Sequence, residues 1–367
     1  MNMKRRSISI AFFGSSIVSA YWNGAATYYR GLSRALHQRG HRIWFFEPDA
    51  YDRQKHRDID DPPYARVHVY GAQSRQGVDN ALLLAAQADI VVKASGVGVF
   101  DDLLEAAVLC QRRPGNRVVY WDVDAPATLA AMQSDTPPPL KRLIPQYDLV
   151  LTYGGGDAVV NAYRELGARR CVPIYNALDA STHFPVPAEE RFRCDLGLLA
   201  NRMPDREARI HEFFFKPAAE LRQRRFLLGG SGWEHNIPRL ANLKCLGHIY
   251  SADHNAFNCS SRAILNINRD SMAQTGFSPP TRIFEAAGAG ACVITDAWQG
   301  IEHFLEPGSE CLVAHDGGEV VRLLQELSAA QARTIGRAAL RRIRSEHTYD
   351  HRACQVEQLL EELLEAR

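Results

Sequence analysis

Several features that define other classes of protein are absent from this sequence. No run of about 18 uncharged apolar residues occurs, so we expect no segment that spans a membrane. Basic residues (43 Lys and Arg) are almost balanced by acidic residues (42 Asp and Glu), which leaves a net charge of +1. A dedicated nucleic-acid-binding protein carries an excess of positive charge, so we expect no nucleic-acid partner. Hydrophobic residues make up 46% of the chain, which is typical of a globular protein.

The cysteines show no pairing pattern. All eight are scattered along the chain without a CxxC motif, and Cys292 lies inside the apolar run GACVIT. Closely spaced cysteine pairs are typical of zinc sites, and disulfide frameworks belong to small secreted domains. The sequence therefore predicts reduced thiols, several of them buried, in a cytoplasmic protein without a metal site.

The N-terminus has some features of a secretory signal. Basic residues at Lys4, Arg5 and Arg6 precede the stretch ISIAFFGSSIVSA, which ends in small residues. Serines and Gly14 interrupt its apolar run, however. We therefore favour a buried strand followed by a glycine turn.

The length of 367 residues predicts about two domains, because domains average roughly 150 residues. Short apolar runs alternate with helical patterns throughout, as in βαβ units that form a parallel sheet. We expect strands at residues 8–14, 42–48, 65–71, 89–95, 116–124, 148–155, 192–200, 224–232, 242–249, 263–269 and 291–297. We expect helices at residues 28–40, 78–88, 100–113, 205–222, 252–263, 281–290 and from about 317 to 366, with a break near Tyr349. The sequence therefore predicts an α/β protein with two Rossmann-like halves in tandem.

The two halves meet in the segment IYNALDASTHFPVP (174–187), which has two prolines, a turn signal and no helical period. We place a hinge linker there. The predicted first domain is 1–173 and the predicted second domain is 188–345, followed by a C-terminal segment at 346–367.

The stretch GFSPPTRIFEAAGAGACVITD (276–296) is the strongest candidate for a binding site. We expect Ser278 to cap a helix that leaves the N–H groups of Thr281 and Arg282 free, and such a helix start attracts anions. Glu285 lies one turn later on the same face, where a carboxylate can bind a ribose diol. The alternative interpretation is an ordinary capped crossover helix with an exposed glutamate.

Two further groups follow predicted strands of the second half. Arg202 and Arg206 follow the strand that ends at residue 200, and Gly230 and Gly232 lie in the turn after the next strand. Ligands of open α/β sheets bind at the carboxyl ends of strands, and Arg forms bidentate phosphate contacts. These residues predict a cradle for a diphosphate. A solvated arginine pair and a simple glycine turn are the alternatives.

These motifs carry a family resemblance over nearly the whole chain. The second half resembles the donor domain of GT-B glycosyltransferases, and TRIFEAAGAGACVITDAWQGIEHFLEPGSECLV (281–313) is most similar to the CgeB-like group. The linker resembles the NGxDxxxFxP hinge of retaining GT-B enzymes. The resemblance implies two Rossmann-like domains that face each other across a cleft, with a C-terminal helix that crosses back to the first domain.

The resemblance also implies roles for individual residues. Glu285 matches the glutamate that holds the nucleotide ribose, and Arg202 and Arg206 match the basic pair near the diphosphate. His248 and Tyr250 match the loop along the base. At Phe277 the sequence departs from the pattern, because retaining enzymes of this type have a sugar-facing glutamate there. The stereochemical outcome is therefore left open.

The first half is expected to supply the acceptor side. Asp122 and Asp124 end a strand and are candidates for a general base. Asn23 is expected to cap the first helix, beside Trp22 and Gly24, and Ser95 lies in another loop at a strand end. These four residues are candidates for binding the substrate. A turn-forming role is the alternative for the aspartates.

The sequence therefore predicts a glycosyltransferase that moves a sugar from a nucleoside-diphosphate donor, such as a UDP- or dTDP-sugar, to a small-molecule, glycan or protein acceptor. We expect no cofactor and no metal requirement, and His347 and His351 lack a third ligand. A non-hydrolysing sugar-nucleotide epimerase and a non-catalytic nucleotide-sugar-binding protein are the alternatives.

Overall fold

The computed structural model describes residues 6–366, which form two compact units. Unit 1 combines the residues up to Tyr175 with those from Tyr349 onward, and unit 2 comprises Asn176–Thr348. The chain thus passes between the units close to the two predicted boundaries. Most of the predicted linker belongs to unit 2, where the backbone N–H of Leu178 donates to the carbonyl of His347 at 2.8 Å.

Unit 1 is built on a parallel sheet of seven strands, counted over the described residues, in the order β3-β2-β1-β4-β5-β6-β7. The strands are β1 (Ser9–Phe13), β2 (Arg42–Asp49), β3 (Arg66–Gly71), β4 (Ile90–Ala94), β5 (Arg117–Asp122), β6 (Leu149–Thr152) and β7 (Cys171–Pro173). Every residue of β1 is buried. The N-terminal apolar run therefore forms a central strand, as predicted, while Lys4 and Arg5 lie outside the described residues.

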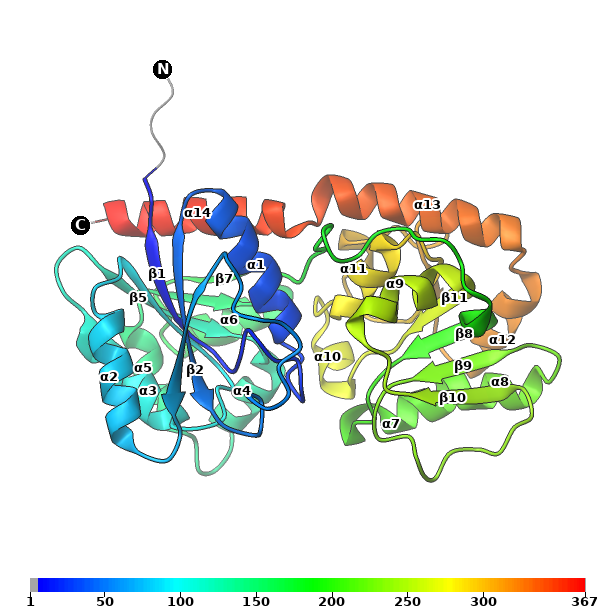
Figure 1. Ribbon diagram of the computed structural model, residues 1–367, viewed down its shortest axis with the longest axis horizontal. Helices are drawn as coiled ribbons and strands as arrows, with labels where there is room; N and C mark the ends of the chain where they lie inside the picture. The colour runs from blue at the N-terminus through cyan, green and yellow to red at the C-terminus, as the bar shows by residue number, and fades with distance from the viewer. Residues whose placement is uncertain (1–5, 367) are drawn as a thin grey trace, which may run out of the picture. The chain divides into compact units, whose positions relative to one another are not determined.

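Helices cover the sheet of unit 1 (Figure 1). They are α1 (Ala26–Gln38), α2 (Arg75–Ala85), α3 (Asp101–Ala107), α4 (Ala125–Met132), α5 (Leu140–Leu143), α6 (Gly156–Glu165) and α14 (Tyr349–Glu365). The C-terminal helix α14 packs on α1, where Gly31 faces the Tyr349 ring. A Cβ at Gly31 would lie 2.1 Å from that ring, so only glycine permits this approach.

Unit 2 repeats the architecture with a parallel sheet in the order β10-β9-β8-β11-β12-β13. The strands are β8 (Cys194–Leu199), β9 (Phe226–Gly229), β10 (Leu243–Gly247), β11 (Ser261–Asn266), β12 (Val293–Asp296) and β13 (Leu312–Ala314). The helices are α7 (Pro204–Ile210), α8 (Lys216–Glu220), α9 (Ser251–Ser260), α10 (Asp270–Thr275), α11 (Thr281–Gly288), α12 (Gly317–Glu326) and α13 (Ala329–Glu346). Each sheet has the strand order of a Rossmann fold, in which the order reverses beside the first strand.

Two helical predictions differ from the structure in detail. The helix predicted at 205–222 contains a π-helical turn at His211–Phe215, just before Pro217. The C-terminal helical region is broken twice, at Leu327, where Ser328 caps α13, and at the predicted break before Tyr349.

The eight cysteines are all unpaired, and Cys292 is buried as predicted. No helix of residues 6–366 is long and apolar enough to cross a membrane.

Candidate functional site

The carboxyl edge of the unit 2 sheet carries the residues predicted to bind the donor. Ligands of such sheets bind at this edge, next to the strands where the order reverses. In unit 2 these strands are β8 and β11, which pair directly. Arg202 follows β8, and Asn268 follows β11. The reversal point therefore lies among the predicted donor residues.

The glycines after β9 serve close packing between neighbouring turns. Gly230 and Gly232 adopt φ values of 134° and 88°, which favour glycine. A Cβ at Gly230 would lie 2.0 Å from the carbonyl oxygen of Ala200, and one at Gly232 would lie 2.9 Å from the Cβ of Arg202. Packing alone explains both glycines, and their contact with a ligand stays a prediction.

Arg202 and Arg206 have different surroundings. The Arg202 guanidinium pairs with Glu207, donates to the carbonyl of His235 at 2.8 Å and stacks on Trp233. Arg206 donates to the carbonyl of Asn201, but its Nε is buried and has no hydrogen-bond partner among residues 6–366. Of the two predicted diphosphate ligands, Arg206 is therefore the one with an unsatisfied donor.

Positive charge is concentrated around Arg206. Burial, together with repulsion by Arg282 and Arg269, lowers the pKa of Arg206 to about 10. Burial also lowers the pKa of Arg282, although Glu285 opposes this shift. Crowded cations in a partly buried position attract an anion. Arg206 and Arg282 are therefore neighbouring cations, and the diphosphate-binding role that the sequence assigned to Arg202 and Arg206 stays a prediction.

The start of α11 differs from the prediction. The helix begins at Thr281 after Pro280, and no side chain caps it. Ser278 is buried, and its hydroxyl donates to the carbonyl of Gly276 at 3.0 Å, so its predicted capping role is wrong. The cause is a turn at Gly276 and Phe277, which have φ values of 71° and 43° and redirect the chain before the helix. The N–H of Ile283 donates to the carbonyl of Pro280 at 3.1 Å, whereas the N–H groups of Thr281 and Arg282 come too early in the helix to have an intrahelical acceptor.

The turn before α11 is strained and firmly anchored. A φ of 43° is uncommon for a bulky residue such as Phe277 and stores strain, which is often found at functional sites. The N–H of Phe277 donates to the carbonyl of Gln299 at 2.7 Å, and its ring leaves no room for a Cβ at Gly300. Next to this anchor, Trp298 is buried and packs on Phe304. The anchor fixes the position of the α11 N-terminus.

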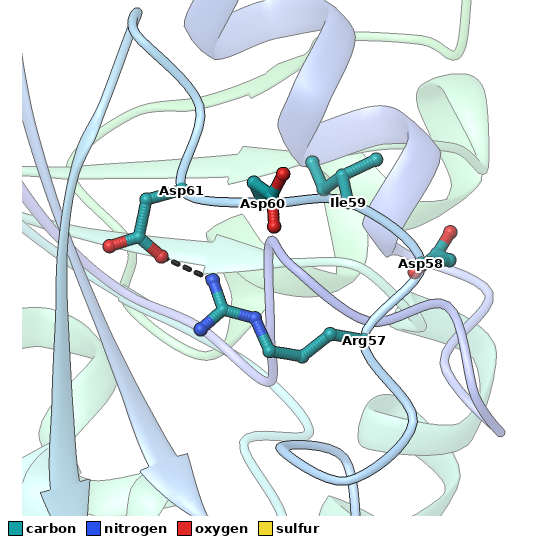
Figure 2. Close-up of a pocket in the computed structure, with 5 residues that line it drawn as sticks. All are labelled: Arg57, Asp58, Ile59, Asp60 and Asp61. Carbon is teal, nitrogen blue, oxygen red and sulfur yellow. Dashed lines mark hydrogen bonds and ion pairs between the residues drawn. The ribbon is translucent and has the colours of Figure 1, made fainter.

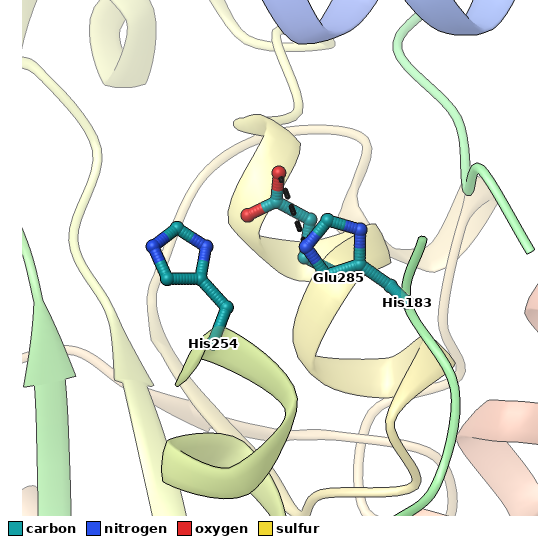
Figure 3. Close-up of side chains that lie close together, drawn as sticks. All are labelled: His183, His254 and Glu285. Carbon is teal, nitrogen blue, oxygen red and sulfur yellow. Dashed lines mark ion pairs between the residues drawn. The ribbon is translucent and has the colours of Figure 1, made fainter. Parts of the chain in front are cut away.

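Two histidines that the sequence did not single out face Glu285 (Figure 3). His183 comes from the predicted linker and His254 from α9, and Nε2 of His183 lies 3.9 Å from Oε1 of Glu285. Burial raises the pKa of Glu285, but the combined effect of His183, His254 and Arg282 is larger and lowers it. The pKa of Glu285 is therefore below its ordinary value. Glu285 is therefore a carboxylate at neutral pH. The three residues lie far apart in the sequence, so no local spacing could have revealed them.

Asn268 is a second site residue that sequence reasoning missed. Its side chain is buried, and neither Nδ2 nor Oδ1 has a hydrogen-bond partner among the described residues. Its backbone N–H donates to the Asp296 carboxylate, which fixes the residue at the end of β11. Buried amides without partners are rare, so Asn268 is a candidate ligand-binding group.

His248 and Tyr250 lie in the loop between β10 and α9. Tyr250 is 71% exposed, and its ring meets that of His248 edge-on with centroids 4.7 Å apart. An exposed aromatic pair has its surface available to a nucleobase. That role stays a prediction.

In unit 1, Asp122 is buried within a network rather than exposed. Its carboxylate accepts hydrogen bonds from Ser95 Oγ, Thr128 Oγ1, Tyr163 Oη and the backbone N–H of Asp124. Burial raises its pKa despite these donors. The predicted role as an exposed general base does not fit this structure, because a fully buried carboxylate cannot reach an acceptor. Asp122 and Ser95 instead hold three strand-end loops together, and Asp124 is only partly buried.

The loop before α1 also differs from the prediction. Asn23 does not cap the helix, which begins at Ala26. Its side chain donates to the carbonyls of Ser16 and Ser19 and accepts from Ser15 Oγ, so it holds the loop together. The ring of Trp22 is 63% exposed at a φ of 47°. Gly24 has open space where a Cβ would lie, so Trp22 and Gly24 remain available to a substrate.

A hollow lies elsewhere in unit 1 (Figure 2). It has a volume of about 510 Å³ and is lined by Arg57–Asp61. Arg57 pairs with Asp61, and Asp58 binds Arg30 through two hydrogen bonds of 2.8 Å. These two pairs offset part of the acidic charge of the loop, and none of the predicted site residues lines the hollow.

His347 and His351 lie on opposite sides of the helix break. His347 ends α13 in unit 2, and His351 lies in α14 of unit 1. They do not share a helix face, so the spacing of four residues has no ligand geometry here.

One family model matches the second half of the chain. Residues 206–360 match the family model described as glycosyl transferase-like. This range contains Arg206, Arg282 and Glu285. No curated protein sequence matches the chain.

Solved structures are similar over nearly the whole chain. Sucrose-phosphate synthase from Thermosynechococcus elongatus is 16% identical, with 99% of this chain and 100% of that chain covered and a TM-score of 0.67. The Anabaena HepE protein in complex with UDP and glucose is 14% identical, with coverage of 97% and 100% and a TM-score of 0.66. An alpha-glucosyltransferase in complex with UDP-glucose and DNA is 12% identical, with coverage of 97% and 100% and a TM-score of 0.72. The fold is GT-B. The two Rossmann-like units of this GT-B chain are those predicted from the sequence.

Proposed function

We propose that this GT-B protein is a CgeB-like glycosyltransferase that takes a hexosyl group from a nucleoside-diphosphate sugar bound to unit 2. The observation that carries the proposal is the set of unsatisfied groups at one sheet edge. Arg206, Arg282 and the N-terminus of α11 supply positive charge, and the carboxylate of Glu285 follows one turn later. All of them lie within the glycosyl transferase-like region.

The diphosphate is the group that this arrangement fits best. When the bond between the sugar and the diphosphate breaks, negative charge grows on the departing oxygen. Two guanidiniums and the free N–H groups of a helix start stabilise this charge when the diphosphate lies beside them. Because Arg206 is crowded by other cations before the donor binds, an anion there also relieves their repulsion.

The nucleoside is assigned to the neighbouring residues. Glu285 accepts hydrogen bonds from the two ribose hydroxyls, and the exposed rings of His248 and Tyr250 lie along the base. Asn268 is assigned to the sugar, because its buried amide offers both a donor and an acceptor without partners among the described residues. The donors found with solved GT-B structures, such as UDP-glucose in the alpha-glucosyltransferase complex, suggest UDP-sugars as the first substrates to test.

Unit 1 is assigned to the acceptor. Trp22 and Gly24 are its most accessible predicted substrate residues. An exposed indole packs well against the apolar face of a sugar or another ring, so a small molecule or glycan is the acceptor class to test first.

The test is incubation with UDP-, dTDP- and GDP-sugars, read by mass spectrometry. Transfer to an acceptor, or slow donor hydrolysis, supports the proposal. An isomerised donor supports a sugar-nucleotide epimerase instead, and binding without turnover supports a nucleotide-sugar-binding protein.

We also propose that turnover needs no divalent cation. Arginines and a helix N-terminus supply the charge that Mg²⁺ supplies in other transferases. Turnover in excess EDTA is expected to equal turnover in Mg²⁺. Loss of activity in EDTA, with recovery on adding Mg²⁺, would contradict this part of the proposal.

A further inference from the structure

The hydrogen bonds around His183 determine which ring nitrogen carries its proton. Thr182 Oγ1 lies 3.2 Å from the carbonyl of Asp179 and 3.0 Å from Nδ1 of His183. A carbonyl can only accept, so the threonine hydroxyl donates to it and accepts from Nδ1–H. In the neutral ring, Nε2 is therefore bare. That nitrogen is buried and has no hydrogen-bond partner among the described residues.

The same argument applies to His254. Its Nε2 lies 3.2 Å from the carbonyl of Ile249, so this nitrogen carries the proton and Nδ1 is bare. Figure 3 shows the rings of His183 and His254 each turning a nitrogen toward the carboxylate of Glu285.

When both rings are neutral, three acceptors therefore converge without a donor between them. One atom from each of His183, His254 and Glu285 lies within 4.8 Å of the others. Two lone pairs and an anionic carboxylate at this separation repel one another unless a positive group lies among them. The shortest contact, 3.9 Å, is too long for a direct hydrogen bond from His183 to Glu285.

We propose that this centre binds Zn²⁺ through Nε2 of His183, Nδ1 of His254 and the carboxylate of Glu285. Zinc prefers imidazole and carboxylate ligands, whereas Mg²⁺ prefers oxygen alone. Zinc–ligand distances of about 2.0–2.2 Å place tetrahedral ligands about 3.5 Å apart, so ligand atoms that now lie within 4.8 Å of one another must close in by up to about 1.3 Å. Thr182 and Ile249 already hold the outer N–H groups, as the second shell of a zinc site does.

The centre shares Glu285 with the proposed ribose site, so this step rests on the proposed function. A carboxylate bound to zinc is not available to the ribose. Zinc therefore inhibits donor binding by competition, while Mg²⁺ leaves it unchanged. Three protein ligands leave a fourth position open for water or another ligand.

Zinc affinity is measured on the full-length protein by competition with a chromophoric chelator. Exposed Cys110 and Cys354 are replaced by serine throughout, because free thiols also bind zinc. We expect one Zn²⁺ per chain, and each of H183A, H254A and E285Q is expected to weaken binding by about tenfold or more. H315A is the matched control, since exposed His315 also contacts a glutamate but has no third ligand. Weak binding that none of the three variants changes would overturn the site.

Cobalt and UDP titrations separate this proposal from the proposed function. Co²⁺ bound at the site is expected to show a low-coordinate visible spectrum without thiolate charge-transfer bands, and such bands would overturn the ligand assignment. UDP affinity is then measured in EDTA and in Zn²⁺. Zinc binding with no UDP binding at all supports the metal centre and contradicts the nucleotide assignment. UDP binding without zinc binding overturns the metal centre, and simultaneous binding of both overturns the sharing of Glu285.

Discussion

The two units have the same strand order but different chemistry at the carboxyl edges of their sheets. In unit 1 the groups at the ends of β4 and β5 satisfy one another: Asp122 accepts four hydrogen bonds, and buried Lys93 donates to Asp101 at 2.7 Å. In unit 2 the corresponding edge keeps buried groups without partners among the described residues, namely the Arg206 Nε, the His183 Nε2 and the Asn268 amide.

The difference indicates which edge of a Rossmann-like sheet binds a ligand and which edge only stabilises the fold. A satisfied network stabilises the protein and offers nothing to a ligand, whereas an unsatisfied buried group costs about 1–3 kcal/mol that a ligand can recover. Unit 2 is therefore expected to lose function when its edge residues change. Unit 1 is expected to lose stability.

Removing the Arg206 guanidinium is expected to have the largest effect. Arg206→Ala removes a preorganised charge near the departing diphosphate, and losses of this kind lower kcat by about 10²–10³-fold. Steady-state turnover of the donor identified in the sugar-nucleotide panel measures it. Arg202→Ala is the paired variant, and its loss is expected to be smaller because Arg202 already pairs with Glu207. A larger loss from Arg202→Ala would reverse the assignment.

The pH dependence that Glu105 gives to folding tests whether the buried charges of unit 1 affect stability. Burial is the main cause that raises the pKa of Glu105 to about 7, from an ordinary value of 4.5. Between these values the folded state holds a proton that the unfolded state releases, so this contribution to stability is complete below pH 4.5 and is lost as the pH rises through 7. The shift corresponds to about 3 kcal/mol.

Glu105→Gln removes that dependence. Relative to wild type, the variant is expected to gain up to about 3 kcal/mol between pH 4 and pH 8. Lys93 keeps Asp101 as its partner in the variant. Denaturant unfolding at both pH values measures the difference, with exposed Glu165→Gln as control. Parallel pH curves for Glu105→Gln and wild type would contradict the prediction.

Asp122→Asn is expected to destabilise unit 1 by about 2 kcal/mol, because an amide group would face at least one of the four donors that now bind the carboxylate. Denaturant unfolding followed by tryptophan fluorescence measures this, since Trp121 is the adjacent residue. The variant also decides between the two roles of Asp122. Unchanged stability with turnover reduced a hundredfold or more would restore it as the general base.

The sequence predicted most of the fold because its strands and long helices carry strong local patterns. The sequence did not predict the strands β7 and β13 or the helices α4, α5, α6 and α10. Strands of three residues carry little periodic signal. The Ser278 cap was wrong because Phe277 adopts a left-handed conformation that propensity does not predict for a bulky residue.

The sequence also could not show which side chains contact one another. The sequence does not distinguish Arg202 from Arg206. Only the fold shows that Arg202 pairs with Glu207, whereas the Nε of Arg206 has no partner among the described residues. Asp122 looks like an exposed strand-end carboxylate until Ser95, Thr128 and Tyr163 are placed around it. Such partnerships depend on contacts between distant segments.

Glu285→Ala is expected to have the smallest effect of the four substitutions. It removes the hydrogen bonds of one charged side chain to the ribose, which corresponds to about tenfold weaker binding of a nucleoside diphosphate, or about 1.4 kcal/mol. Calorimetry with UDP in excess EDTA measures it without competition from metal. Glu319→Ala is the control, because the partly exposed Glu319 also contacts a histidine but lies outside the site. Equal UDP affinity for Glu285→Ala and wild type would show that the ribose binds elsewhere, and the unsatisfied edge of unit 2 would then need another ligand to explain it.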